Sequence, residues 1–370
     1  MKICIVLPSL LGGGAERMHI LMADEWIKNG NTVDFIILDD SNERGALKSI
    51  LPKNSNSKIL GVQKLRKSLF PLKRLFKENS FQIILVPMWP LTVIAILAKL
   101  LALSNSKIVI SDHTHLSTSR VPELGVPLTI LRLTIGIFYR FSDAIVCVSK
   151  GVAQDIAKLG KLNRKNISVI YNPICDSVPH DNSSIANVNL WREGAKFKLL
   201  AVGSLKEQKN FSNLILAYSK LNNDIKKNSH LIILGEGPLR KNLENLISAL
   251  NLSKNISLPG FMIDPNPWFK TADLFILSSS WEGFGNVIVE ALYHKTPVVS
   301  TDCNSGPREI LENGRFGELV EPNNPDELSK AIEFSLSSEH DLDSLFNRSQ
   351  DFTIIKASQD YIDLFRSLKN

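Results

Sequence analysis

The stretch MKICIVLPSLLGGGAERMHILMADEWIKNGNTVDFIIL, residues 1–38, indicates the fold. Its apolar run at Lys2–Leu7 predicts a buried strand, and a glycine-rich loop at Gly12–Gly14 follows that strand. Residues Ala15–Asn29 have the periodicity of an amphipathic helix, and Thr32–Leu38 predicts a second strand. A strand, a helix and a strand in this order are typical of a parallel sheet covered by helices on both faces.

The same alternation continues along the chain and starts again once. Further strands in the first series are predicted at Gln82–Pro87, Lys107–Ser111, Ala144–Ser149 and Ser168–Tyr171. The second series has predicted strands at Phe197–Gly203, Leu231–Gly235, Leu274–Ser278 and Pro297–Thr301. Helices are predicted near Asn210–Leu221, Pro238–Leu250 and Asn286–Lys295, and from Asn324, the predicted N-cap, onward.

The expected architecture is α/β, with two Rossmann-like domains of similar size that face each other across a cleft. The predicted domains are residues 1–172 and 197–352. The segment 173–196 between them is a predicted linker, because it is rich in Asn, Asp, Ser and Pro and has no periodicity. Residues 353–370 are predicted to form a helix that returns to the first domain. Ligands of such sheets bind at the carboxyl ends of the strands.

Composition is that of an ordinary soluble protein, with 44% hydrophobic and 22% charged residues. The four cysteines have no spacing typical of disulfides or metal sites, so we expect reduced thiols and a cytoplasmic protein. We interpret the apolar run Ile3–Leu11 as the first strand and not as a signal peptide. Leu91–Leu103, with Lys99 inside it, is too short to span a bilayer and is a predicted buried or interfacial helix.

Basic residues are concentrated in the first half of the chain. Residues 1–170 hold 23 Lys and Arg against 12 Asp and Glu, whereas the remaining residues hold 20 against 25. The segment Lys58–Lys77 contains seven basic residues and no acid. One helical face of it, which we expect Pro71 to kink or interrupt, carries Leu65, Leu69, Leu72 and Phe76. The segment predicts either contact with an anionic membrane or a solvated basic face over the core. Nucleic acid is not an expected partner, because aromatic residues are not interleaved with these charges.

Four loops at predicted strand ends could bind a ligand. They lie at residues 12–16, 203–210, 235–238 and 278–286. Glycines in the first loop would let a diphosphate approach backbone N–H groups at a helix start, although a purely structural turn is the alternative. A dinucleotide fingerprint there is imperfect, because Arg17 stands where its third glycine belongs. Lys206 and Lys209 in the second loop could neutralise a phosphate. The third loop is interpreted as structural.

The fourth loop is the most informative, because it leads into a helix from Asn286 that is apolar around most of its circumference. Glu290 stands in its narrow polar stripe, and Glu282 precedes the helix in a glycine-rich loop. A carboxylate on a nearly buried helix points to a polar ligand, unless its side chain merely reaches solvent.

The spacing of Glu282 and Glu290 resembles the E-x7-E motif of retaining glycosyltransferases with the GT-B fold. A wider set of motifs is similar to glycosyltransferase family 4 and occurs in order along nearly the whole chain. These motifs are GGAE at 13–16, VGSLKEQKN at 202–210, LGEGPLR at 234–240, LPGF at 258–261, EGFGNVIVEA at 282–291 and PVVSTDCNSGPREIL at 297–311.

The resemblance implies a role for each matching position. Glu282 would contact the donor sugar, Glu290 the ribose hydroxyls and Lys209 the diphosphate. Phe284, Gly285 and Asn286 would offer backbone groups to the donor, Gly14 would lie near the phosphates or the acceptor, and Phe261 would flank the base. The family histidine near the sugar is expected at His113, in preference to His115. The first domain would bind the acceptor and the second the nucleotide sugar.

One position departs from the family pattern. Ser204 stands where the family usually has arginine, and Lys206 could substitute for it only as a point charge. We see no metal-binding Asp-x-Asp at a strand end, so neither a metal nor a cofactor is expected. The resemblance implies retention at the anomeric carbon, with the leaving phosphate oxygen helping to deprotonate the acceptor.

The expected reaction is transfer of a hexose or N-acetylhexosamine from a UDP-sugar to a lipid-linked glycan, with polyprenyl diphosphate as the carrier, or to another oligosaccharide acceptor. The basic first half suggests peripheral contact with the inner face of the plasma membrane, in surface-polysaccharide or glycan biosynthesis. Three alternatives stay open: a sugar-nucleotide epimerase of GT-B type, an NAD-dependent oxidoreductase with Asp39 or Asp40 on the ribose, and a non-catalytic sugar-nucleotide binder.

Overall fold

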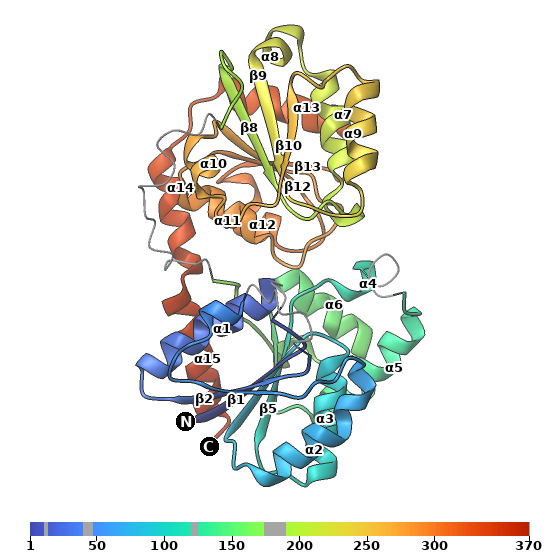
Figure 1. Cartoon of the computed structure of the whole chain (residues 1–370), viewed down its shortest axis with the longest axis vertical. Coiled ribbons are helices and arrows are strands. Elements are labelled where there is room, and N and C mark those ends of the chain that lie inside the picture. Colours follow the sequence, from blue (N-terminus) through green and yellow to red (C-terminus); the bar gives the residue numbers. More distant parts are fainter. Residues whose placement is uncertain (11–13, 40–46, 120–124, 174–189, 370) are drawn as a thin grey trace. The chain divides into compact units, whose positions relative to one another are not determined.

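The computed structural model describes residues 1–10, 14–39, 47–119, 125–173 and 190–369 (Figure 1). The chain divides into two compact units. The first contains Met1–Asp176 together with Phe352–Asn370, and the second contains Ser177–Asp351. Each unit is built around one parallel sheet with helices, so the predicted α/β class is confirmed.

The sheet of the first unit has seven parallel strands in the order β3-β2-β1-β4-β5-β6-β7. They are β1 (Lys2–Leu7), β2 (Thr32–Ile37), β3 (Asn56–Ile59), β4 (Ile83–Pro87), β5 (Lys107–Asp112), β6 (Ala144–Cys147) and β7 (Ile167–Val169). Ile3 pairs with Val33 on one side and with Ile83 on the other. The central strands β1 and β4 are almost entirely buried because helices cover both faces of the sheet.

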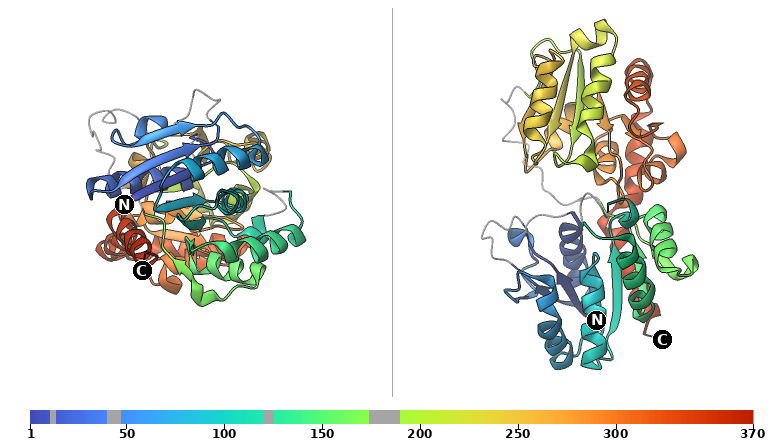
Figure 2. Two further views of the ribbon diagram at one scale, coloured as in Figure 1. Left: turned by 90° about the horizontal axis from the view of Figure 1, so that it is seen from below. Right: turned by 90° about the vertical axis from the view of Figure 1, so that its right-hand side faces the viewer.

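The helices of the first unit form two groups. On one side, α1 (Gly14–Lys28) packs against α15 (Ile354–Ser367). The second group packs in series and consists of α2 (Leu69–Glu78), α3 (Leu91–Ala102), α5 (Leu128–Phe138) and α6 (Lys150–Gly160). Right-handed crossovers place the two groups on opposite faces, because the strand order reverses between β1 and β4 (Figures 1 and 2). The short α4 (Leu116–Ser119) follows β5.

The C-terminal helix α15 is part of the core of the first unit. Its residues Tyr361 and Phe365 are fully buried beside Trp26 of α1, whose ring lies 5.5 Å from that of Phe365. The indole N–H of Trp26 donates to the carbonyl oxygen of Ser358 over 3.1 Å.

The second unit has six parallel strands in the order β10-β9-β8-β11-β12-β13. They are β8 (Phe197–Val202), β9 (Ser229–Leu234), β10 (Ile256–Gly260), β11 (Leu274–Leu277), β12 (Val298–Thr301) and β13 (Glu318–Val320). Its helices are α7 (Phe211–Lys220), α8 (Asn223–Asn228), α9 (Arg240–Ala249), α10 (Asn266–Thr271), α11 (Asn286–Tyr293), α12 (Pro307–Ile310), α13 (Pro325–Ser337) and α14 (Leu342–Ser349). The predicted cap of α13 is confirmed, since the side chain of Asn324 accepts from the N–H of Glu327.

The structure differs from expectation at Pro71. Pro71 is the third residue of α2, where its missing N–H has no helical partner to lose, and the residues before α2 form a separate 3₁₀ helix at Leu65–Ser68, so the helical segment is divided before Leu69 and not at Pro71.

Most of the predicted linker, residues 174–189, lies outside the described residues, but its end packs on the second unit. Trp191 is buried and its indole N–H donates to Thr271 Oγ1 over 2.9 Å.

Candidate functional site

Lys209 and Glu282 meet at the carboxyl ends of two neighbouring strands. Lys209 ends the short 3₁₀ helix η7 (Glu207–Lys209) after β8, and Glu282 lies in the loop after β11. Strands β8 and β11 pair where the strand order of this sheet reverses, which is the usual ligand position in such sheets. The ammonium nitrogen of Lys209 lies 2.6 Å from Glu282 Oε1. The structure therefore brings together the two residues predicted for the sugar and the diphosphate.

The Glu282 carboxylate is held by further hydrogen bonds. Its side chain is buried, with the residue 6% exposed. Ser279 Oγ donates to Oε1 over 2.6 Å, whereas Gln208 Nε2 donates to Oε2 over a longer 3.3 Å. Ser305 Oγ donates to the Glu282 carbonyl oxygen over 2.7 Å, which fixes the backbone as well. Oε1 is thus saturated by two donors, while Oε2 keeps acceptor capacity for a hydroxyl group.

The loop that precedes α11 packs closely against the loop that precedes α12. Gly285 precedes the helix with a φ of 101°, and a side chain at Gly306 would place its Cβ 1.7 Å from the carbonyl oxygen of Phe284. Only glycine therefore permits this approach at position 306. The N–H groups of the first turn, from Asn286 onward, form an end that favours a bound anion.

The side chains predicted for this loop and helix differ in burial. Phe284 is buried, so its predicted contribution is that of its backbone. Asn286 and Glu290 are partly exposed, while Ile288 and Leu292 are buried, as expected for a mostly apolar helix with a narrow polar stripe.

Two predicted residues of the second unit lie in exposed positions. Lys206 caps η7, and its ammonium group makes no ion pair with any described residue, so the structure does not join it to the Lys209–Glu282 pair. Ser204 in the same loop is also exposed. Phe261 follows β10 and is 68% exposed, which leaves its ring free to stack on a flat group.

The predicted residues of the first unit are His113 and Gly14. Gly14 is the first residue of α1, and the remainder of its glycine loop lies outside the described residues. His113 follows β5, and its Nε2 lies 2.9 Å from Ser111 Oγ. Burial and the neighbouring His19 hold the pKa of His113 well below its usual range, so the ring is neutral. His115 was the less preferred position for the family histidine, and its Nδ1 lies 3.6 Å from Asp155 Oδ2.

A buried carboxyl group that was not among the predicted site residues lies beside His113. Asp112 is 1% exposed, and Tyr139 donates its hydroxyl to Asp112 Oδ1 over 3.2 Å. Burial raises the pKa of Asp112 to about 7. The signal available in the sequence was an acidic residue at the carboxyl end of an apolar strand.

The described residues offer no ready metal centre. They contain no group of three or more His, Cys, Asp or Glu side chains that could hold a metal ion. Cys4, Cys147 and Cys303 are free, buried thiols, as expected, and Cys175 lies outside the described residues. A search of the described helices finds none that is both long and apolar enough to cross a membrane.

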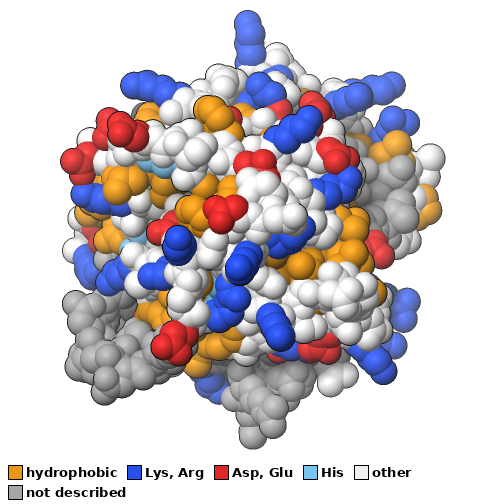
Figure 3. Space-filling view, turned by 90° about the horizontal axis from the view of Figure 1, so that it is seen from above, with side chains coloured by type: hydrophobic (Ala, Val, Ile, Leu, Met, Phe, Trp, Pro, Cys, Tyr) orange, Lys and Arg blue, Asp and Glu red, His pale blue; other side chains and the backbone are white. Residues whose placement is uncertain are grey.

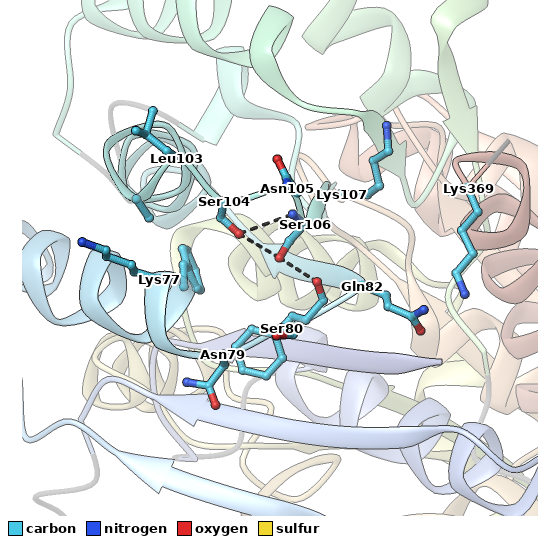
Figure 4. Close-up of a pocket in the computed structure, with 13 residues that line it drawn as sticks. Lys77, Asn79, Ser80, Gln82, Leu103, Ser104, Asn105, Ser106, Lys107 and Lys369 are labelled. Atoms are coloured by element: carbon cyan, nitrogen blue, oxygen red, sulfur yellow. Dashed lines mark hydrogen bonds between the residues drawn. The ribbon is translucent and has the colours of Figure 1, made fainter.

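A pocket of about 810 Å³ lies elsewhere in the first unit (Figure 4). It is lined by residues that precede β4 and β5, among them Ser80, Ser104 and Ser106, and by Lys77 and Lys107. Ser106 Oγ donates to the Phe81 carbonyl oxygen over 2.7 Å and lies 2.9 Å from Ser104 Oγ. The pocket is at the amino ends of the strands and contains none of the predicted site residues, so it is not the candidate site.

Two family models match the chain one after the other. "Glycosyltransferase Family 4" matches residues 12–177, and "Glycosyl transferases group 1" matches residues 185–351.

Two similar proteins come from Campylobacter jejuni. An N-acetylgalactosamine-N,N'-diacetylbacillosaminyl-diphospho-undecaprenol 4-alpha-N-acetylgalactosaminyltransferase is 32% identical over 247 residues, which are 66% of this chain and 64% of that protein. A GalNAc-alpha-(1->4)-GalNAc-alpha-(1->3)-diNAcBac-PP-undecaprenol alpha-1,4-N-acetyl-D-galactosaminyltransferase is 24% identical, and the match covers 100% of this chain and 99% of that protein.

A similar solved structure is that of HepE from Anabaena in complex with UDP. It has a TM-score of 0.80 and 22% sequence identity, and the match covers 99% of this chain and all of that one. This likeness gives the fold of both units, and the two family models span nearly the whole sequence. The chain therefore belongs to glycosyltransferase family 4, within the group 1 glycosyltransferases, and has the GT-B fold.

Proposed function

We propose that the protein transfers a hexose or N-acetylhexosamine from a UDP-sugar to a polyprenyl-diphosphate-linked glycan, with retention at the anomeric carbon. The observation that carries the proposal is the Lys209–Glu282 pair beside the amino end of α11. The names of the two Campylobacter relatives, which include undecaprenol diphosphate carriers, support this acceptor class. The UDP in the HepE complex supports the nucleotide.

Cationic groups of the site contact the diphosphate of the donor, and its carboxylates contact the hydroxyl groups of the donor. Lys209 has three N–H donors, of which one is used by Glu282, so the other two are available to a phosphate. The N–H groups at the start of α11 add partial positive charge, and together they stabilise the departing diphosphate without a resident metal ion. Glu282 Oε2 accepts from a sugar hydroxyl and Glu290 from the ribose. The leaving phosphate oxygen then takes the proton of the acceptor hydroxyl.

Transfer is tested by incubating the protein with individual UDP-sugars and polyprenyl-diphosphate-linked acceptors, followed by mass spectrometry of the lipid product. We expect one added sugar with an α linkage, and we expect EDTA to leave the rate unchanged. Conversion of a UDP-sugar without acceptor would favour an epimerase, and tight binding of NAD would favour an oxidoreductase. A donor that binds without any turnover would indicate a non-catalytic binder.

We further propose that the first unit contacts an anionic membrane leaflet through α5. In the basic segment that suggested such contact, Leu72 and Phe76 are buried in the core, so their apolar face is not available to lipid. Helix α5 instead exposes an apolar stripe of Ile130, Leu133 and Ile137, which continues to Phe141. These positions share one helical face, because they are three to four residues apart.

The charges around this stripe suit an anionic surface. Arg132 and Arg140 are exposed beside it, and residues 125–142 contain no acidic side chain. The basic side chains of α2, such as Lys77, belong to the neighbouring helices of the same group. By contrast, the face seen in Figure 3 carries acidic side chains between its lysines and arginines.

Sedimentation with vesicles tests the membrane proposal. At low salt we expect binding to vesicles that contain phosphatidylglycerol and weak binding to pure phosphatidylcholine. Leu133→Gln together with Ile137→Gln should lower the bound fraction. Phe334→Gln, a change at an equally exposed residue of α13, should not. No difference between the double variant and this control would contradict a role for α5.

A further inference from the structure

Arg240, the first residue of α9, contacts three parts of the second unit. Its Nη2 and Nε donate to the two carboxylate oxygens of Glu236 over 2.6 Å and 2.9 Å. Its Nη1 donates to Glu244 Oε1 over 2.9 Å. Its Nη2 also donates to the carbonyl oxygen of Leu258 over 3.1 Å. One guanidinium group thus joins the loop after β9, helix α9 and strand β10.

Leu258 lies in a bulge of β10. Between Ser257 and Gly260, β10 contains one residue more than the part of β9 with which it pairs. Pro259 has no N–H group for the ladder, and β10 is at the edge of its sheet. A bulge bends its strand and changes the direction of the side chains beside it. The hydrogen bond from Arg240 therefore fixes a segment that strand pairing alone holds only in part.

Gly260 packs directly on the ion pair of Arg240 and Glu236. It has a φ of 103°, and a Cβ at this position would lie 3.0 Å from Glu236 Oε1 and 3.6 Å from Arg240 Nη2. Its carbonyl oxygen accepts from the N–H of Gly235 over 2.8 Å. The ion pair and the loop after β9 thus fix the backbone immediately before Phe261.

The loop after β9 is itself attached to the loop after β8. The N–H of Leu205 donates to the carbonyl oxygen of Glu236 over 2.9 Å. Gly237 permits this approach, because a Cβ there would lie 2.5 Å from the carbonyl oxygen of Leu205. Lys209 also follows β8, so the loop that carries the proposed diphosphate ligand is linked by hydrogen bonds to the segment before Phe261.

The exposed ring of Phe261 follows directly after this fixed segment. Strand β10 is two positions away from β8 in the sheet, and two strand spacings amount to about 10 Å. The proposed UDP donor is long enough to span this distance, so its flat base can reach Phe261 while its diphosphate lies at Lys209. Aromatic side chains bind such bases by stacking.

The ion pairs of Arg240 do not by themselves explain its arrangement. Arg240 is partly exposed and its two acidic partners are exposed, and such pairs contribute little to stability. The hydrogen bond to Leu258 has a different effect, because it acts on the backbone that directs Phe261.

We propose that Arg240 is a positioning residue that fixes the bulge of β10 and thereby orients the Phe261 ring for stacking on the base of the nucleotide. The stacking on the base rests on the proposed function, whereas the fixed bulge does not.

The first test needs no ligand. Hydrogen exchange with mass spectrometry reports on the backbone of residues 256–262 in Arg240→Met, a change that keeps the helix propensity of the position. We expect exchange in this segment to be about tenfold faster than in the unaltered protein, because its amides open more readily. Arg240→Lys should give a smaller increase, since an ammonium group cannot reproduce the planar contact with Glu236 and Leu258. Arg240→Lys also takes the place of Arg240→Met if that variant does not fold.

The second test is a double-mutant cycle with UDP as the probe. Arg240→Met and Phe261→Ala should each raise the Kd for UDP about tenfold. Because Arg240 acts through Phe261, the double variant should also show a rise of about tenfold, whereas independent effects would multiply to about a hundredfold. In Arg240→Met the KM for UDP-sugar should rise and kcat should change less than about twofold, because the base is remote from the bond that breaks.

Two controls separate this role from the loss of an ion pair or of stability. Glu244→Ala removes the pair with Nη1 but leaves the contact with Leu258, so exchange and the Kd for UDP should be unchanged. Arg192→Met removes another guanidinium group of the second unit, one that donates to the carbonyl oxygen of Ser229 at the amino end of β9. It should also leave the Kd for UDP unchanged.

Three results would each overturn the inference and leave glycosyl transfer standing. They are unchanged exchange of residues 256–262 in Arg240→Met, an unchanged Kd in Phe261→Ala, and a multiplied effect in the double variant. A Kd that rises equally in Arg192→Met would overturn it as well. If the unaltered protein binds no UDP and transfers no sugar, the proposed function fails, but faster exchange in Arg240→Met would still establish that Arg240 fixes the bulge.

Discussion

The Lys209 ammonium group and the Glu282 carboxylate form an ion pair between loops that are 73 residues apart in the sequence. The pair joins the ends of β8 and β11, and each partner is largely buried. Each charge is part of the proposed donor site, and each also compensates the buried charge of its partner. Replacing either residue should therefore affect both activity and stability.

Replacing Lys209 with alanine should lower both activity and stability. The change removes the charge that stabilises the leaving diphosphate, so we expect kcat to fall about 10²–10³-fold. It also leaves Glu282 buried without its partner, which should lower the free energy of unfolding by about 3 kcal/mol. Steady-state kinetics and urea denaturation measure the two effects. Lys220→Ala, which breaks an exposed pair with Asp326, should change stability by less than about 1 kcal/mol. Equal behaviour of the two variants would contradict the role of Lys209.

Ser204→Arg should strengthen donor binding. Position 204 is exposed in the loop after β8, so the longer side chain fits without a change in the core. A guanidinium there can bind a phosphate through two N–H groups, and we expect the Kd for UDP to fall about tenfold. Isothermal titration calorimetry measures this Kd, and Ser204→Lys should give a smaller gain. An unchanged Kd would mean that the diphosphate lies out of reach of this loop.

Glu290→Ala should weaken binding of the nucleotide more than it affects the fold. Glu290 is partly exposed on α11, whose buried face is formed by residues such as Ile288 and Leu292. Loss of its hydrogen bonds to the ribose should raise the Kd for UDP about tenfold, with little change in thermal stability. Glu244→Ala on α9, which removes another exposed carboxylate, serves as the control. Equal Kd values for the two variants would dismiss the ribose contact.

Asp112 should make stability depend on pH with an unusual sign. Because its pKa rises from 3.8 to about 7 on folding, the folded state binds more protons than the unfolded state between these values. The stabilisation is complete below pH 3.8 and is lost as the pH rises through 7. The free energy of unfolding of the unaltered protein should therefore fall relative to Asp112→Asn by about 1.4 kcal/mol per pH unit in this window.

His19 acts in the opposite direction and partly hides this effect. Its pKa falls from 6.5 to about 4 on folding, so its contribution to stability grows as the pH rises between these values. The slopes of Asp112 and His19 nearly cancel, but the lowered pKa values of His113 and His230 add further rising slopes. The stability of the unaltered protein should therefore rise with pH in this window, and that of Asp112→Asn should rise more steeply. Urea denaturation from pH 4.5 to pH 8 measures both proteins, and parallel curves would show that Asp112 has an ordinary pKa.

Most strands of both sheets could be predicted because their residues are apolar on both faces, as in β1 and β4. Three edge strands, β3, β10 and β13, were not predicted. Residues Asn56–Ile59 of β3 are exposed throughout and lack the alternation that signals a strand. Ile256–Gly260 contains a proline, and Glu318–Val320 is only three residues long. Pairing with a neighbouring strand, which sequence periodicity does not report, defines all three.

The sequence suggests candidate residues for the site but not the contacts between them. Glu282, Glu290 and Lys209 could be identified because glycines and capping residues mark the loops that carry them. That Lys209 and Glu282 touch depends on β8 and β11 being neighbours, which follows from the strand order. The hydrogen bond between Tyr361 and Ser111 could not be predicted, because it depends on how α15 packs against β5 and joins residues that are 250 positions apart in the sequence.

The return of α15 to the first unit determines the order in which the chain can complete itself during synthesis. Residues 177–351 are contiguous, so the whole sequence of the second unit is synthesised before Ile354–Ser367 is made. Trp26, at the other end of the chain, keeps an uncovered apolar surface for that whole period, until Ser358 and Phe365 arrive to cover it. The unit whose first residues are translated earliest therefore cannot complete its core until α15 has been made.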